Sequence, residues 1–168
     1  MSKKTIWITG GSTGIGKALA IKFANKGWNV AVSARRVELL DELSKNYENI
    51  SSFPLDVTDK TKCIEVFNQI KTKFENIDIC FFSTGTWNLK KEKDIDVEQM
   101  EDVFKVNFFG TVNSIKAVEE YFRNKKSGII TIVSSIAGYR GLPNSTGYGP
   151  SKSALNNLAE SLYFDFKR

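Results

Sequence analysis

The stretch Thr9-Gly10-Gly11-Ser12-Thr13-Gly14-Ile15-Gly16 joins a short apolar run, Ile6-Trp7-Ile8, to a segment with the apolar spacing of a helix. Glycine tolerates positive φ angles and lets a backbone approach a ligand closely, so a strand can turn sharply into a helix here. A helix that begins between Ser12 and Gly14 would direct unpaired N–H groups and the positive end of its dipole toward an anion. The stretch therefore predicts a phosphate-binding turn of a dinucleotide site, the alternative being a tight turn that holds no ligand.

Short apolar runs alternate with helix-patterned segments along the rest of the chain. We expect further strands at residues 30–34, 52–55, 77–82 and 129–133, with helices between them. Thr58 or Asp59 is the expected N-cap of one helix, and residues 90–96 are expected to form a charged loop. Strands joined by helical crossovers lie parallel, so the predicted fold class is α/β, a doubly wound parallel sheet of the Rossmann type.

Length and composition indicate one soluble globular domain. The chain has 168 residues, of which 41% are hydrophobic and 26% charged. No run approaches the roughly 20 apolar residues of a membrane span, and no signal peptide is recognisable, so we expect a cytoplasmic protein with no membrane partner.

The content of histidine and cysteine narrows the chemistry. The chain has no histidine, which excludes a Ser/His/Asp triad and the commonest metal ligand, and we expect no metal site. Cys63 and Cys80 lie in apolar segments without C-x-x-C spacing and are expected to be buried free thiols. Acid–base chemistry must therefore use Tyr, Lys, Asp or Glu.

The net charge of +5 comes from scattered lysines, with no basic run interleaved with aromatic residues. This pattern favours a solvated surface over a nucleic-acid site. The same positive field would attract a polyanionic cofactor.

The carboxyl ends of the strands are where ligands bind in such sheets. Ala34 follows the second strand at the position where an acidic residue would bind the ribose hydroxyls of NAD, and Arg35 and Arg36 come next. Guanidinium groups suit a 2′-phosphate because they offer charge and a planar fork of donors. The sequence thus favours NADP(H) over NAD(H), unless the two arginines only face solvent.

Tyr148 and Lys152 are four residues apart and share one face of a predicted helix. A phenol is a poor base at neutral pH, and a nearby cation favours its ionised form. Pro150 is compatible with this helix if it lies in the first turn, where its missing N–H would have had no partner. Taken alone, such a pair is usually an ordinary pair of surface residues.

Together these motifs resemble the short-chain dehydrogenase/reductase family, whose signatures are T-G-x-x-x-G-x-G and a serine followed by Tyr-x-x-x-Lys. The resemblance implies a catalytic set of Asn107, Ser135, Tyr148 and Lys152. Asp56 and Val57 match the segment that contacts adenine. The cofactor-binding residues implied are Gly10, Ser12, Thr13, Gly14, Ile15, Gly16, Arg35, Arg36, Asp56, Val57, Gly85, Tyr148 and Lys152.

The chain departs from the family pattern in two places. Phe82-Ser83-Thr84-Gly85 stands where the family usually has Asn-Asn-Ala-Gly, so the glycine is kept but the amides that brace the sheet are absent. Family members also usually continue beyond the Tyr/Lys helix with two more strands and a segment that closes over the substrate. We therefore expect residues 1–168 to be a single dinucleotide-binding domain that is incomplete at its C-terminus.

The missing strands would leave the fifth strand, residues 129–133, at the edge of the sheet. The resemblance implies that helices around residues 98–120 and 151–166 pack against another subunit of a homodimer or homotetramer.

The function implied by the resemblance is an NAD(P)(H)-dependent oxidoreductase that moves a hydride between nicotinamide and a small carbonyl or alcohol substrate. Tyr148 would move the proton, Ser135 would bind the substrate oxygen, Lys152 would hold the nicotinamide ribose and favour ionised Tyr148, and Asn107 would support a proton relay. The alternative is a nucleotide-binding or subunit-interaction module that lacks turnover because its substrate lid is missing.

Overall fold

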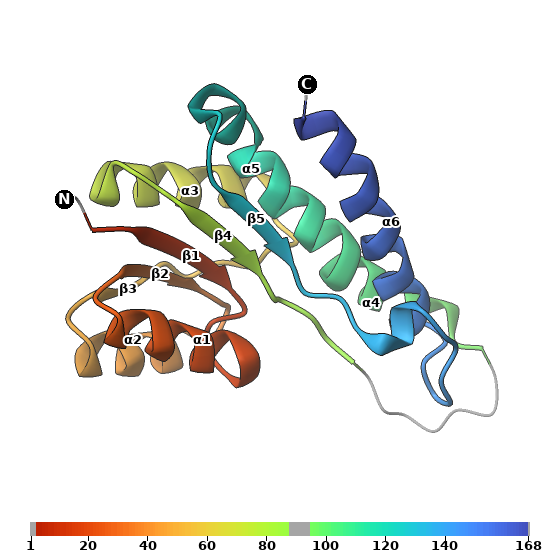
Figure 1. Cartoon of the computed structure of the whole chain (residues 1–168). Coiled ribbons are helices and arrows are strands. Elements are labelled where there is room, and N and C mark those ends of the chain that lie inside the picture. Colours follow the sequence, from red (N-terminus) through yellow and green to blue (C-terminus); the bar gives the residue numbers. More distant parts are fainter. Residues whose placement is uncertain (1–2, 88–94, 168) are drawn as a thin grey trace.

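The computed structural model describes residues 3–87 and 95–167 and shows a parallel sheet with helices on both faces (Figure 1). Its strand order is β3-β2-β1-β4-β5, and every neighbouring pair is parallel. The predicted doubly wound α/β class is confirmed. In chain order the elements are β1 (Thr5–Thr9), α1 (Gly14–Asn25), β2 (Asn29–Ser33), α2 (Val37–Asn46), β3 (Ile50–Ser52), α3 (Lys60–Phe74), β4 (Ile79–Phe82), α4 (Val97–Phe104), the π-helical turn η1 (Lys105–Phe109), α5 (Gly110–Lys125), β5 (Ile129–Ile132), the short 3-10 turn η2 (Ile136–Gly138) and α6 (Tyr148–Phe166).

The side chains of β1 alternate between two hydrophobic cores. Ile6 and Ile8 pack with α1 and α2 on one face, where Ala20 and Leu40 are fully buried. Trp7 faces the other side and stacks on Phe67 of α3 at a ring-centroid distance of 5.6 Å. This second core also includes buried residues of α5 and receives partly buried residues of α6. Because the sheet is covered on both faces, its central strands are apolar on both faces.

The third strand lies earlier than the sequence predicts. Residues 52–55 were expected, whereas β3 spans Ile50–Ser52. Pro54 has no N–H to donate, so a regular ladder cannot run through it. The N–H groups of Phe53 and Leu55 nevertheless donate to the carbonyls of Val32 and Ala34 at 2.9 and 3.0 Å, which carries the chain along β2 to Asp56.

The helical segment between β4 and β5 is not one regular α-helix. A π-helical turn separates α4 from α5 and contains Asn107, which is fully buried. Such turns often occur at functional sites, because the extra residue rotates one side chain out of the regular helical register. The N-cap prediction for α3 is confirmed at Asp59, whose carboxylate accepts from the Lys62 N–H at 2.9 Å.

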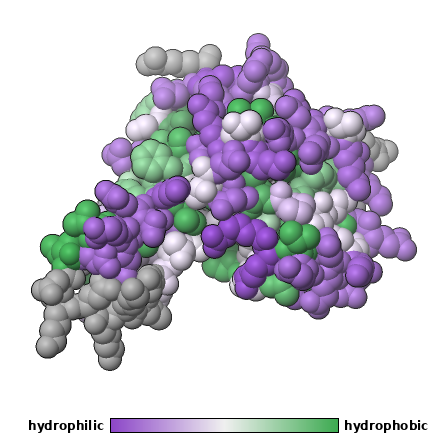
Figure 2. Space-filling view, turned by 180° about the vertical axis from the view of Figure 1, so that it is seen from behind, coloured by the Kyte–Doolittle hydropathy of each residue, from purple (hydrophilic) through white to green (hydrophobic). Residues whose placement is uncertain are grey.

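The surface on the reverse side is mainly hydrophilic, with smaller hydrophobic areas between the charged side chains (Figure 2). Cys63 and Cys80 are buried free thiols, as predicted. Among the described residues, no helix has both the length and the hydropathy that a membrane span requires. The predicted loop at residues 90–96 falls largely outside the described residues; Asp96 is the N-cap of α4.

Candidate functional site

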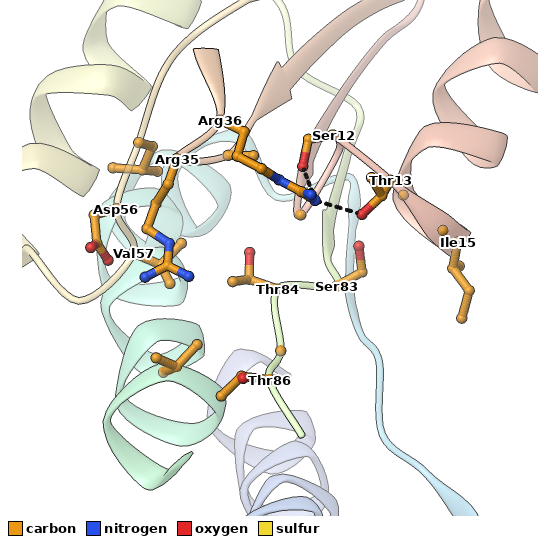
Figure 3. A pocket seen from close by; sticks show the side chains of 17 residues that line it. Ser12, Thr13, Ile15, Arg35, Arg36, Asp56, Val57, Ser83, Thr84 and Thr86 are labelled. Atoms are coloured by element: carbon orange, nitrogen blue, oxygen red, sulfur yellow. Dashed lines mark hydrogen bonds between the residues drawn. The ribbon is translucent and has the colours of Figure 1, made fainter. Parts of the chain in front are cut away.

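A pocket of about 370 Å³ lies beyond the carboxyl ends of β1, β2 and β4 (Figure 3). The sequence predicts ligand binding at this same edge of the sheet. The glycine turn, both arginines and the segments after β3 and β4 all reach it. Its lining includes the predicted residues Gly10, Ser12, Thr13, Gly14, Ile15, Gly16, Arg35, Arg36, Asp56, Val57 and Gly85.

The glycine turn packs closely against the chain after β4 and against α1, and it leaves open space at Gly14. Gly10 has a φ of +72°, and a Cβ there would lie 2.9 Å from the Ser83 carbonyl carbon. A Cβ on Gly16 would collide with the Gly10 carbonyl, so α1 could not approach β1 as closely. Gly14, at φ +56°, has open space where its Cβ would stand. A phosphate group fits this cradle because α1 begins there and presents unpaired N–H groups.

Arg36 reaches back from the end of β2 to the same turn. Its guanidinium donates to Ser12 Oγ at 3.1 Å and Thr13 Oγ1 at 2.8 Å (Figure 3). These hydroxyls hold the cation at the rim of the phosphate cradle. The contact argues against a guanidinium that only faces solvent.

Arg35 lies on the side of the pocket formed by Asp56 and Val57 (Figure 3). Burial acts to raise the pKa of Asp56, but hydrogen bonds from the Thr58 N–H and hydroxyl, and the charge of Arg35, hold that pKa below its ordinary value. Asp56 therefore stays ionised near neutral pH and balances part of the positive charge around the pocket.

Ser83 replaces the missing amides as the brace between β4 and β1. Its N–H and hydroxyl both donate to the Thr9 carbonyl, at 3.3 and 2.7 Å. The neighbouring Thr84 Oγ1 is buried and has no hydrogen-bond partner among the described residues, although Thr84 lines the pocket. A buried hydroxyl without a partner is costly, and a bound polar ligand would satisfy it. The pocket thus fits a dinucleotide.

Asn107 and Lys152 converge behind Gly85. The Asn107 side chain accepts from the Thr86 N–H at 2.7 Å and donates to the Thr86 carbonyl at 3.0 Å and to Ser151 Oγ at 3.1 Å. A Cβ on Gly85 would lie 3.5 Å from both Asn107 Oδ1 and Lys152 Nζ. The π-helical turn thus directs an amide that joins the chain after β4 to α6.

Lys152 is 4% exposed, and its ammonium donates to the Val133 carbonyl at 2.8 Å. Burial lowers the pKa of this lysine. Its Nζ lies 5.7 Å from the centre of the Tyr148 ring, as the four-residue spacing predicted. Pro150 lies in the first turn of α6, where its missing N–H is tolerated.

Ser135 is the N-cap of η2 and accepts from the Ala137 N–H at 3.2 Å. Within residues 3–87 and 95–167 no hydrogen bond joins it to Tyr148. Ser135 lies directly before η2, whereas Tyr148 is the first residue of α6.

Sequence reasoning missed several residues of the site. Thr86 and Trp87 follow Gly85 directly, and no periodicity or motif marks them. The Trp87 ring stacks on Tyr148 at 5.4 Å with an interplanar angle of 24°. Ala34, Leu55, Ser83, Thr84 and Val106 complete the wall of the pocket, and only their positions near strand ends or helix turns could have indicated them.

Comparison with known proteins agrees with this geometry. A family model described as short chain dehydrogenase matches residues 4–168. An uncharacterized oxidoreductase of Staphylococcus saprophyticus is 32% identical over 167 residues, which cover 96% of this chain and 71% of that protein. The chain therefore belongs to the short-chain dehydrogenase family of NAD(P)-dependent oxidoreductases.

Other relatives are longer than this chain. A mouse dehydrogenase/reductase, SDR family member 7, is 30% identical, and the match covers 97% of this chain but 51% of the mouse protein. The solved structure of ElxO with NADP bound superposes with a TM-score of 0.91 at 30% identity, covering 98% of this chain and 68% of ElxO.

Proposed function

We propose that this chain binds NADP(H) and carries the proton-transfer residues of an oxidoreductase that acts on a carbonyl or alcohol group. The observation that carries the proposal is the contact of Arg36 with Ser12 and Thr13 at the pocket, together with Lys152 and Asn107, which do not line the pocket but lie directly behind Gly85 of its wall. The NADP-bound state of ElxO, a structural relative, supports the same cofactor class.

The cofactor, when bound, would supply or accept the hydride. In the reducing direction Tyr148 gives its phenolic proton to the carbonyl oxygen, and in the oxidising direction it takes that proton back. Ser135 donates a hydrogen bond to the same oxygen. Lys152 contributes a positive charge beside Tyr148 and holds the ribose end of the cofactor, and Asn107 supports the proton relay while it fixes Thr86.

The choice of cofactor is tested by titration. With two guanidinium groups at the pocket, NADPH should bind at least about tenfold more tightly than NADH, a difference of about 1.4 kcal/mol. Replacing Arg36 by Met should remove most of this preference. Arg140 is an exposed arginine after η2, and the control variant Arg140→Met should retain the preference. Nicotinamide fluorescence measures both affinities, and equal affinities in the parent chain would refute the NADP preference.

The competing function is a nucleotide-binding or subunit-interaction module without turnover. Incubating the chain with NADPH and a panel of ketones and aldehydes discriminates the two. Oxidation of NADPH that depends on the carbonyl compound supports the enzyme, and tight binding without oxidation supports the module. The chain spans between half and three quarters of the relatives described, so the same panel should be run on a version extended to their length.

We also propose that the protein is a cytoplasmic homodimer or homotetramer, formed through the helices around residues 98–120 and 151–166, and that residues 1–168 act as one dinucleotide-binding unit. Exposed aromatic side chains on these helical segments support the homo-oligomer; they include Phe109 and Phe164, which are 55% and 65% exposed.

A further inference from the structure

Trp87 occupies an unusual position beside the proposed proton donor. Its indole lies nearly parallel to the Tyr148 ring, with the ring centroids 5.4 Å apart, and half of the residue remains exposed. One face of the phenol is therefore covered by a large flat apolar surface that continues out to the solvent.

Two sets of contacts hold Trp87 in this position. The preceding residue, Thr86, is fixed through its N–H and its carbonyl by the side chain of the buried Asn107. The indole Nε1–H donates to the Asn144 carbonyl at 3.4 Å, and Asn144 has a left-handed backbone with φ 55°. The ring thus bridges the chain after β4 and the loop before α6.

The segment between β5 and α6, which contains Ser135, carries further exposed apolar side chains. Ile136 and Tyr139 are 75% and 82% exposed, and Leu142 is 44% exposed. Ile136 directly follows Ser135, and exposed apolar side chains beside polar groups are typical of a site for an apolar ligand. A flat ring binds such a surface better than a branched chain, because aromatic pairs gain from stacked or edge contacts beyond the area they bury.

We propose that Trp87 determines substrate specificity and selects carbonyl compounds that carry an aromatic ring next to the carbonyl group. The inference rests on the proposed function of Tyr148. The substrate ring packs against the exposed part of the indole while its carbonyl oxygen points to the Tyr148 hydroxyl.

Binding can be measured without turnover. The chain has three tryptophans, so a nitrogen–proton correlation spectrum of the NADPH-loaded protein shows three indole N–H signals, and the Trp87→Phe variant identifies that of Trp87. We expect an aryl methyl ketone to shift this signal at concentrations where an aliphatic methyl ketone of equal carbon number leaves it in place. The signals of Trp7 and Trp28 should stay fixed, since Trp7 is fully buried and Trp28 packs on Phe23, away from the pocket.

Turnover gives the second readout. Trp87→Ala should lower kcat/KM for the aryl ketone at least about fivefold relative to the aliphatic ketone, mainly through KM, and Trp87→Phe should restore part of the ratio. Trp28→Phe is the matched control and should leave the ratio unchanged. An unshifted Trp87 signal, or an aryl-to-aliphatic ratio that Trp87→Ala leaves intact or raises, would overturn the proposal. A shifted signal without any turnover would support the site while refuting the proposed enzyme.

Discussion

At the scale of single residues, the site combines a buried cation with an accessible phenol. Lys152 donates to the Val133 carbonyl and lies over the Tyr148 ring, in surroundings that disfavour its charge and lower its pKa. A buried ammonium remains charged only if nearby groups stabilise it. The Val133 carbonyl is one such group, and a bound ribose would add further oxygen acceptors.

Replacing Tyr148 by Phe tests the proton-transfer role. The variant keeps the ring that stacks on Trp87, so NADPH affinity should stay nearly unchanged, whereas turnover should fall at least about a hundredfold because the acid is lost. Tyr163→Phe, an exposed tyrosine on the same helix, serves as the control. Steady-state kinetics and NADPH titration measure the two effects, and normal turnover in Tyr148→Phe would remove this residue from the mechanism.

At the scale of elements, Asp78 joins three parts of the fold at the start of β4. Its carboxylate accepts from the Thr5 N–H of β1 at 2.8 Å and from the Asn76 amide at 3.0 Å, and it pairs with Lys125 of α5 at 3.4 Å. Burial acts to raise the pKa of Asp78, but these hydrogen bonds and the lysine charge together lower it from 3.8.

This shift predicts how stability depends on pH. Below about pH 4 the unfolded chain takes up a proton on Asp78 before the folded chain does, so the stabilisation present at neutral pH is lost as the pH falls toward the folded-state pKa. Asp78→Asn should therefore lower the urea concentration at the unfolding midpoint at neutral pH. The midpoint of the variant should then decrease less than that of the parent as the pH is lowered. Asp41→Asn, at an exposed carboxylate on α2, is the control. Urea unfolding from pH 6 to 2 (roughly the range where carboxylates titrate) is the measurement, and parallel curves for parent and Asp78→Asn would contradict the prediction.

At the scale of the whole molecule, the β5 edge of the sheet has no neighbouring strand within the described residues. β5 is an edge strand, as predicted, and Ile129 at its start is 56% exposed. A groove of about 910 Å³ runs between β5, the end of α5 and α6, and Ile130, Leu162 and Phe166 are part of its lining. An apolar strand edge without charge or proline favours association with another chain.

The proposed oligomer, formed through helices that include α6, is tested at an exposed residue of α6 outside this groove. Phe164→Glu places a charge on the exposed face of α6 and should shift the mass in light scattering toward the 18.9 kDa of one chain. Val37→Glu, a partly exposed apolar residue on α2, should leave the mass of the parent unchanged. If the parent chain is already monodisperse at one chain's mass, the homo-oligomer is wrong for residues 1–168.

The sequence by itself determined the sheet, its turns and the edge at which the pocket lies. Glycine spacing and the alternation of apolar runs are local signals, because backbone freedom and side-chain periodicity depend on neighbouring residues. Tyr148 and Lys152 could be paired for the same reason, since helix geometry places residues four apart on one face.

Only the tertiary structure decided how distant segments meet. The hydroxyl of Ser83 bonds to Thr9, the amide of Asn107 fixes Thr86, and the ring of Trp87 stacks on Tyr148. The partners in each pair are at least 21 residues apart in the sequence and leave no periodic trace in the chain. Their contacts arise because parallel strands and a helical turn end at one edge of the sheet, which brings side chains from separate parts of the sequence together.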